Sequence, residues 1–407
     1  MGQDRGDLWY ATFFPNGIAL GIIGTLIPLY FIQELNATLV DLGLMTFAAS
    51  VLLIPATIYL GSLPDRYRMS KPFILASFLG VSFILYLMTI TTSVIIFQVL
   101  YVAKEFLTYL KGPSASILIA ETYERKRRSS MIARQGFVES LGGVVGLGLC
   151  ILMVDAFGYK TLLTLTIPLV FVSFIIGLLT IQEPPLYIER SLDKIDRVID
   201  DMEGFSYHLT DQGTLAPDFS GEWRFGHKYN MRLFGLGRAI YAFATSNALT
   251  TLSIFLLKEA RFTSSLVFVA FQIRNVVGAL SYLFVDRLFG EKGERAVKIG
   301  TFLRVIVIGL LPVVLWLPMP LSVVAASIIL SLVALSWSVY SVGVGVITVL
   351  YSASGGLGFY DSLASLGGAI GNYSGGLIPT LYGFETLFVL SSLLFVLAFF
   401  LFYLSMK

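Results

Sequence analysis

Charged residues are scarce in this sequence: Asp, Glu, Lys and Arg make up only 13% of its 407 residues. Soluble domains carry about 25% of these residues, so the composition excludes a soluble globular protein. The formal net charge of +2 is too small to favour nucleic-acid binding. Hydrophobic residues reach 56%, and the mean hydropathy is +0.81. The chain is therefore predicted to be an integral membrane protein.

Cysteine and histidine are also rare, and their positions exclude several kinds of site. The single cysteine, Cys150, lies inside an apolar run, so neither disulfides nor thiolate metal ligands are expected. Both histidines, His208 and His227, lie in one polar segment, so histidine is not expected to carry protons across a bilayer. The sequence contains no H-E-x-x-H and no G-x-S-x-G motif. We therefore expect no enzyme activity, no metal and no cofactor.

Long apolar runs occupy most of the chain. Each is long enough to cross a hydrocarbon core of about 30 Å as a helix. The runs cover approximately residues 8–32, 39–60, 73–91, 94–120, 131–157, 161–181, 231–257, 264–289, 296–317, 321–351, 357–382 and 387–406. The backbone groups of a segment in lipid must bond within that segment, so the pattern predicts an all-α integral membrane protein with about twelve transmembrane helices.

One polar segment, residues 182–230, separates the runs into two sets of six. We therefore expect an N-terminal lobe of residues 1–181, a linker of residues 182–230 and a C-terminal lobe of residues 231–407. The linker contains an amphipathic helix pattern that fits the surface of a membrane. Its apolar positions are Leu192, Ile195, Ile199 and Met202. Two roles remain open for the linker: a tether between the lobes, and a regulatory or partner-binding segment.

The distribution of basic residues predicts the orientation. About twenty Lys and Arg residues fall on the side of the N-terminus, and cytoplasmic loops carry such an excess. Only Lys160, Lys258 and Arg261 fall on the opposite side. Both termini are therefore expected in the cytoplasm, with the protein in the cell membrane.

The stretch G-S-L-P-D-R-Y-R-M-S-K-P, which begins at Gly61, is predicted as a short charged loop between two apolar runs. Gly61, Asp65 and Arg66 match the pattern G-x-x-x-D-R-x-G-R-R, found between helices 2 and 3 of the major facilitator superfamily. A second Asp-Arg pair, Asp286 and Arg287, ends a later apolar run in the equivalent place. The chain thus resembles that family over nearly its whole length.

The resemblance implies two six-helix lobes that rock around a substrate site near the middle of the membrane. It also implies a small-molecule substrate, surrounding membrane lipid and a monomeric protein. Residues of the two Asp-Arg segments are expected to gate the cytoplasmic side, and Asp361, near a helix N-terminus, is expected to cap or gate. The gating candidates are Gly61, Asp65, Arg66, Asp286, Arg287 and Asp361.

Ionisable residues inside apolar runs are costly in lipid and usually face a cavity or a partner. Lys104 and Arg274 each lie about 15 Å into their runs, near the middle of the membrane. Their joint presence favours an anionic substrate group held between them. The alternative is that each forms an ion pair within its own lobe, with Glu105 available to Lys104. Adjacent residues on a helix point about 100° apart, so Lys104 and Glu105 are not expected to face each other well.

Glu105 and Glu139 are the candidates for carrying a coupling proton. A carboxylate in a membrane cavity can bind and release a proton as the cavity opens to either side. For Glu139, the alternative to proton coupling is a salt bridge to Arg134 or to a partner helix, and both interpretations remain open. Further polar and aromatic residues are predicted to bind substrate or line its cavity: Tyr101, Asn247, Asn275, Trp337, Tyr340 and Arg238. Arg304 is interpreted as structural, because the family keeps its helix peripheral.

Glycines spaced by four residues let helix backbones approach closely. Gly142 and Gly146 form one such face, and Gly367, Gly371 and Gly375 form another. The family resemblance places both helices where the lobes meet, so these faces are expected to let one lobe rock on the other.

The sequence therefore predicts a secondary transporter that moves a small organic solute, expected to be an anion, with proton coupling as symporter or antiporter. Three alternatives remain on the same fold: an exporter of hydrophobic drugs or lipids, a passive facilitator, and a sensor that transports nothing.

Overall fold

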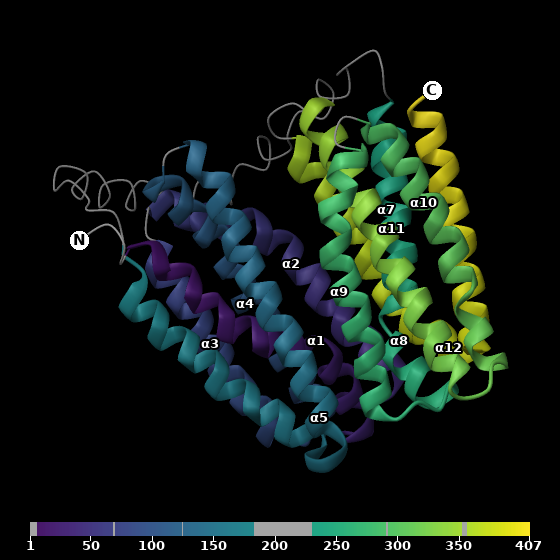
Figure 1. The fold of residues 1–407 in the computed structure, drawn as a ribbon, viewed down its shortest axis with the longest axis horizontal. Coiled ribbons are helices and arrows are strands. Elements are labelled where there is room, and N and C mark those ends of the chain that lie inside the picture. The colour runs from purple at the N-terminus through teal and green to yellow at the C-terminus, as the bar shows by residue number, and fades with distance from the viewer. Residues whose placement is uncertain (1–5, 68–69, 124, 183–229, 290–291, 352–355) are drawn as a thin grey trace, which may run out of the picture.

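The computed structural model describes residues 6–67, 70–123, 125–182, 230–289, 292–351 and 356–407, and this part of the chain contains helices and no strands. Figure 1 shows the helices in two bundles, one formed by the first half of the chain and one by the second. The predicted amphipathic linker helix lies outside the described residues.

The first bundle begins with a short 3-10 helix, η1 (Gly6–Thr12), and continues with five long helices. They are α1 (Phe13–Gln33), α2 (Leu39–Tyr67), α3 (Ser70–Ile90), α4 (Val94–Thr122) and α5 (Arg125–Thr180). α5 contains a break at Gly158, whose φ of 74° is one that residues with a Cβ rarely adopt. α5 is therefore two helices in sequence that meet at this glycine.

The second bundle repeats this arrangement. Its helices are α7 (Met231–Leu249), α8 (Leu252–Ile254), η3 (Phe255–Glu259), α9 (Ser264–Phe289), α10 (Gly293–Gly309), η4 (Leu311–Trp316), α11 (Leu321–Tyr351) and α12 (Gly356–Ser405). α12 breaks at Gly383, which has a φ of 82°. The two breaks occupy corresponding places, as expected for two repeats of one six-helix unit.

Eight helices in the described part of the chain are long and apolar enough to cross a membrane. α5 and α12 each hold two crossings, so these eight helices provide ten. α2 and α4 have 29 residues each, which is long enough for two more crossings and agrees with the predicted number of about twelve. α4 carries three charged residues, Lys104, Glu105 and Lys111, within its apolar run.

Local side-chain caps fix where several helices begin. At the start of α2, Thr38 and Asp41 bond each other reciprocally: the Thr38 amide donates to Asp41 Oδ2 at 2.9 Å, and the Asp41 amide donates to Thr38 Oγ1 at 3.1 Å. This is the capping-box geometry, which satisfies amides that a helix leaves free. Asn230 caps α7 by accepting from the Leu233 amide at 3.3 Å.

Within each bundle, glycine lets helices pack backbone to backbone. A Cβ on Gly142 or Gly146 would collide with the backbone of α1, and one on Gly371 would collide with the backbone of α7. The expectation that these faces lie between the lobes was wrong, because both pack inside a lobe. Spacing by four identifies a face for close packing but does not identify the partner helix.

The bundles meet through α5 and α9 and through α2 and α12. Figure 1 shows them closest near the break in α5 and diverging toward the end that carries both termini. At the close end, the Ser265 hydroxyl donates to Asp155 Oδ2 at 2.5 Å, and the Tyr159 and Ser264 hydroxyls lie 2.5 Å apart. The structure is therefore closed at the end opposite the termini.

The second contact between the bundles joins α2 to α12. Asn372 Nδ2 donates to Ser50 Oγ at 2.9 Å, and Gly43 and Gly376 let the two backbones approach. This glycine pair, rather than the predicted faces, is the close approach between the bundles.

The segment that begins at Gly61 is not the predicted loop. α2 continues to Tyr67, and α3 begins at Ser70, so Asp65 and Arg66 lie in the last turns of α2. A fall in hydropathy marks the edge of the hydrocarbon, not the end of the helix, because the helix can continue in water beyond that edge.

Candidate functional site

Two adjoining cavities lie between the bundles. The first has a volume of about 550 Å³ and the second about 460 Å³. Thr245 and Leu249 of α7 line both, so the two lie side by side in the space between the bundles. Their walls come from α1, α2, α4 and α5 of the first bundle and from α7, α8, α9, α10, α11 and α12 of the second. This size suits a small-molecule site.

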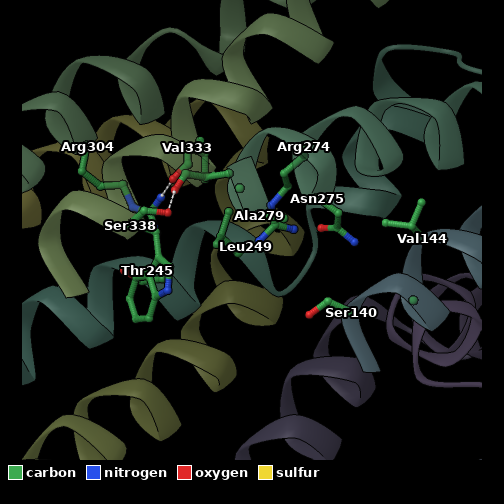
Figure 2. A pocket seen from close by; sticks show the side chains of 14 residues that line it. Ser140, Val144, Thr245, Leu249, Arg274, Asn275, Ala279, Arg304, Val333 and Ser338 are labelled. Atoms are coloured by element: carbon green, nitrogen blue, oxygen red, sulfur yellow. Dashed lines mark hydrogen bonds between the residues drawn. The ribbon is translucent and has the colours of Figure 1, made fainter. Parts of the chain in front are cut away.

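The first cavity is the cationic part of this space, and Figure 2 shows its lining residues. Arg274 and Asn275 enter from α9, Arg304 from α10 and Trp337 from α11, while Ser140 of α5 faces them from the first bundle. The predicted binding residues Arg274, Asn275 and Trp337 are therefore brought together here.

Arg304 is a cavity residue that the sequence interpretation missed. It is 1% exposed, and its Nη1 donates to the Val333 carbonyl at 2.5 Å and to Ser336 Oγ at 3.2 Å. Its guanidinium carbon lies between 5.8 and 5.9 Å from the ring centres of Tyr241, Trp337 and Phe395. The signal was present, because Arg304 is an ionisable residue deep in an apolar run, but the expected peripheral place of its helix hid the role.

Arg274 lies over the Phe271 ring, with its guanidinium carbon 5.5 Å from the ring centre. Arg304 is close enough to repel it electrostatically. No carboxylate of a described residue forms a salt bridge with either arginine. The first cavity is thus bounded by two guanidinium groups without an acidic partner in the described part of the chain.

The second cavity is lined mainly by neutral polar groups together with one carboxylate. Tyr101 and Glu105 of α4 face Thr250, which follows the last residue of α7, and Asn372 of α12 across it. Asn372 Oδ1 accepts a hydrogen bond from the Thr250 hydroxyl at 2.8 Å. Glu105 is therefore the acidic group that this space offers to solvent or ligand within the described residues.

Lys104 and Glu105 form an ion pair despite being adjacent on one helix. Lys104 Nζ donates to Glu105 Oε1 at 2.6 Å and lies 4.7 Å from the centre of the Tyr101 ring. The expectation that the two would not face each other was wrong, because the flexible lysine stem folds back over the helix surface. Lys104 is 4% exposed and lies outside the cavity lining.

Glu139 belongs to a second, partly buried charge cluster, inside the first bundle. Its Oε1 accepts from Asn16 Nδ2 at 3.0 Å and from Lys111 Nζ. The cluster joins α1, α4 and α5, and its lysine, rather than Arg134, is the salt-bridge partner of Glu139. Glu139 does not line either cavity, although the next residue, Ser140, does.

Three predicted cavity residues lie elsewhere. Arg238 forms a salt bridge with the gating candidate Asp361 at 2.5 Å, joining α7 to α12. Asn247 is fully buried and donates to Ser391 Oγ at 2.8 Å. Tyr340 is buried and stacks on Tyr241 with ring centres 3.6 Å apart. These contacts hold the second bundle together.

The remaining gating candidates lie at the termini end of α2 and α9. The side chains of Gly61, Asp65, Arg66, Asp286 and Arg287 lie outside the described part of the structure. Among the described residues there is no group of three or more His, Cys, Asp or Glu side chains that could hold a metal ion.

Solved structures of membrane transporters share this fold. The nucleoside transporter NupG matches with a TM-score of 0.71 at 12% identity, covering 100% of this chain and 99% of that chain. The human organic anion transporter MFSD10 gives a TM-score of 0.60 at 16% identity, covering 99% and 100%. A bacterial homologue of the human lysosomal transporter Spinster gives 0.65 at 14% identity, covering 98% and 95%. These likenesses confirm the predicted fold class.

A search of curated proteins returned no match. The sequence profile of the Major Facilitator Superfamily, in contrast, matches residues 9–356, well over half of the chain. With its twelve-helix fold, the chain belongs to the Major Facilitator Superfamily.

Proposed function

We propose that this protein is a secondary active transporter that moves a small organic anion across the membrane by alternating access. The observation that carries this proposal is Arg274, which lines the cavity between the bundles without an acidic partner among the described residues. An unpaired cation at membrane depth is costly unless something compensates it. A bound anion would supply that compensation.

The geometry does not support the predicted binding of an anion between Lys104 and Arg274. Lys104 is paired with Glu105 and lies behind the cavity wall, so the binding role falls to Arg274, Asn275 and Trp337. Lys104 instead holds the Glu105 carboxylate at the wall of the second cavity.

We propose Glu105 as the proton carrier. It lines the cavity that adjoins the substrate site, and its ion pair with Lys104 gives it two states, paired as a carboxylate and released when protonated. Glu139 is a weaker candidate, because it is bound inside the first bundle by Asn16 and Lys111. We assign that cluster to stability.

We also propose that both termini lie in the cytoplasm, as the excess of basic residues on that side favours. The expectation of a monomer in the cell membrane remains part of the proposal. In that orientation the structure is closed outside and open inside. We expect the Asp-Arg segments of α2 and α9 to be apart in this state and to meet when the cavity opens outward.

Two of the structural relatives are named as transporters of nucleosides and of organic anions. Both classes are small organic solutes, and the second agrees with the cationic cavity. A hydrophobic-drug or lipid exporter fits less well, because two arginines line the first cavity and one of them, Arg304, is buried.

The test is uptake into proteoliposomes with an imposed pH gradient, using a panel of carboxylates, phosphate esters, neutral sugars and cationic drugs. We expect carboxylates or phosphate esters to accumulate and to stop accumulating when an uncoupler collapses the gradient. Uptake that only equilibrates would identify a passive facilitator. Selective uptake of cationic or neutral compounds, or no flux of any compound, would reject the proposal.

A further inference from the structure

We propose that Arg304 is a second anion-binding residue beside Arg274, and that the substrate is an aromatic acid whose ring packs on Trp337. This inference rests on the proposed function and assigns the substrate class of the same cavity. The acidic group carries two or more oxygens, as in a carboxylate or a phosphate monoester.

The first observation is an unsatisfied donor. Arg304 lines the first cavity, and its Nε is buried with no hydrogen-bond partner in the described part of the chain. Within the described residues, both hydrogen bonds of this side chain come from Nη1, and no acceptor contacts the Nε–Nη2 edge of the guanidinium. That edge binds two oxygens of one carboxylate or phosphate side by side.

The second observation is that the guanidinium is held in place. The rings of Tyr241, Trp337 and Phe395 surround it, and Nη1 is fixed by the Val333 carbonyl and by Ser336. A rigid fork loses little conformational entropy when it binds an anion. A purely structural arginine would be expected to satisfy Nε as well, because an unmade bond at a buried donor is costly.

The third observation is the direction of the two arginines. Figure 2 shows the side chains of Arg274 and Arg304 directed toward each other across the first cavity. Both positive charges line one cavity and repel each other. An anion between them would offset that repulsion and the burial of the Arg304 charge.

Two further groups define the rest of the substrate. Trp337 lines the cavity and is 42% exposed, so an indole surface is available beside the arginines. Thr245 lies at the junction of the two cavities, and its hydroxyl is buried without a hydrogen-bond partner among the described residues. An aromatic ring on Trp337 and one polar substituent near Thr245 would use both groups.

The test measures binding of benzoate, phenyl phosphate, cyclohexanecarboxylate and benzyl alcohol to the purified full chain by calorimetry. We expect benzoate or phenyl phosphate to bind more tightly than benzyl alcohol, which lacks the acidic group. We also expect benzoate to bind more tightly than cyclohexanecarboxylate, which lacks the aromatic ring. Comparing benzoate with phenyl phosphate distinguishes the two acidic groups. Equal binding of benzyl alcohol and both acids would overturn the inference.

Substitutions then assign the residues. We expect Arg304→Met to weaken binding of the preferred acid by about tenfold or more, since charged hydrogen bonds have this magnitude. Lys298→Met is the matched control: Lys298 also lies on α10 over an aromatic ring, 5.3 Å from the centre of Tyr403, but outside both cavities. Unchanged acid binding by Arg304→Met, or an equal loss in Lys298→Met, would contradict the assignment.

Two more variants keep the test decisive if Arg304→Met does not fold. Arg304→Lys retains the charge without the planar fork, so we expect an intermediate loss of acid affinity. Trp337→Leu should weaken benzoate several-fold and leave acetate unchanged. Acid binding equal to wild type in both variants would reject the inference. A different result would reject the proposed function: wild-type protein that binds these acids but moves none of them across the membrane.

Discussion

Lys104 Nζ lies 2.6 Å from Glu105 Oε1, so two adjacent residues of one helix form an ion pair at membrane depth. Only the carboxylate of this pair lines the cavity. The pair therefore places a titratable group at the wall and its counter-charge behind it.

We expect Glu105→Gln to abolish accumulation against a gradient and to preserve exchange of substrate across the membrane. Glutamine keeps the shape of the side chain but cannot carry the proton. The measurement is pH-gradient-driven uptake compared with counterflow in the same proteoliposomes. Gradient-driven accumulation by Glu105→Gln at the wild-type level would remove Glu105 from the coupling role.

The Lys111–Glu139 pair should contribute to stability rather than to transport. Removing one partner of a buried pair leaves an unpaired charge and costs about 3–5 kcal/mol, whereas replacing both partners by apolar residues is often nearly neutral. We expect Lys111→Met and Glu139→Leu to lower the melting temperature singly and the double variant to recover most of the loss. Additive losses in the double variant would show that the two side chains are not coupled.

Two nearby glycines of α5 provide a matched test of the packing. A Cβ at Gly146 would collide with the Ile18 backbone, whereas one at Gly148 would meet no atom within 4 Å. We expect Gly146→Ala to destabilise the protein by about 1–3 kcal/mol, the usual cost of overpacking. Gly148→Ala should be neutral or slightly stabilising, since alanine favours the helix. Thermal melts of the two purified variants provide the comparison, and equal melting temperatures would contradict the α1–α5 contact.

Under the proposed alternating access, the contact between the bundles at the end opposite the termini opens during transport. Asp155 and Ser265 are directly hydrogen bonded there, so cysteines at both positions should form a disulfide under mild oxidation. In a Cys150→Ala background, we expect the cross-link to stop transport and a reductant to restore it. Each single-cysteine variant serves as the control. Full transport by the cross-linked protein would show that this end does not open.

The sequence determined the fold because membrane helices are encoded in the length of apolar runs, and residues 182–230 are the one long interruption. It could not determine partners within the bundles. Glycine spacing identified Gly142 and Gly146 but not α1 as the helix they pack on. Likewise, the rotation of Lys104 toward Glu105 depends on side-chain rotamers that the helical period does not specify.

The sequence predicted only part of the candidate site. Arg274, Asn275 and Trp337 follow from the cost of polar groups in lipid and from helix depth, and they do line one cavity. Asn247 and Tyr340 carry the same signal but are used for packing, because helix rotation decides whether a polar residue faces the cavity or a neighbour. Arg304 is the reverse case: it lines the cavity but was interpreted as structural, because its helix was expected to be peripheral.

The most direct test of the central claim is the initial rate of carboxylate and phosphate-ester uptake by Arg274→Gln in proteoliposomes, measured beside wild type and Lys298→Gln. If Arg274 compensates the substrate charge in the cavity, the rate should fall by about tenfold or more in Arg274→Gln and stay near wild type in Lys298→Gln. An initial rate of anion uptake by Arg274→Gln equal to that of the wild type would contradict the account.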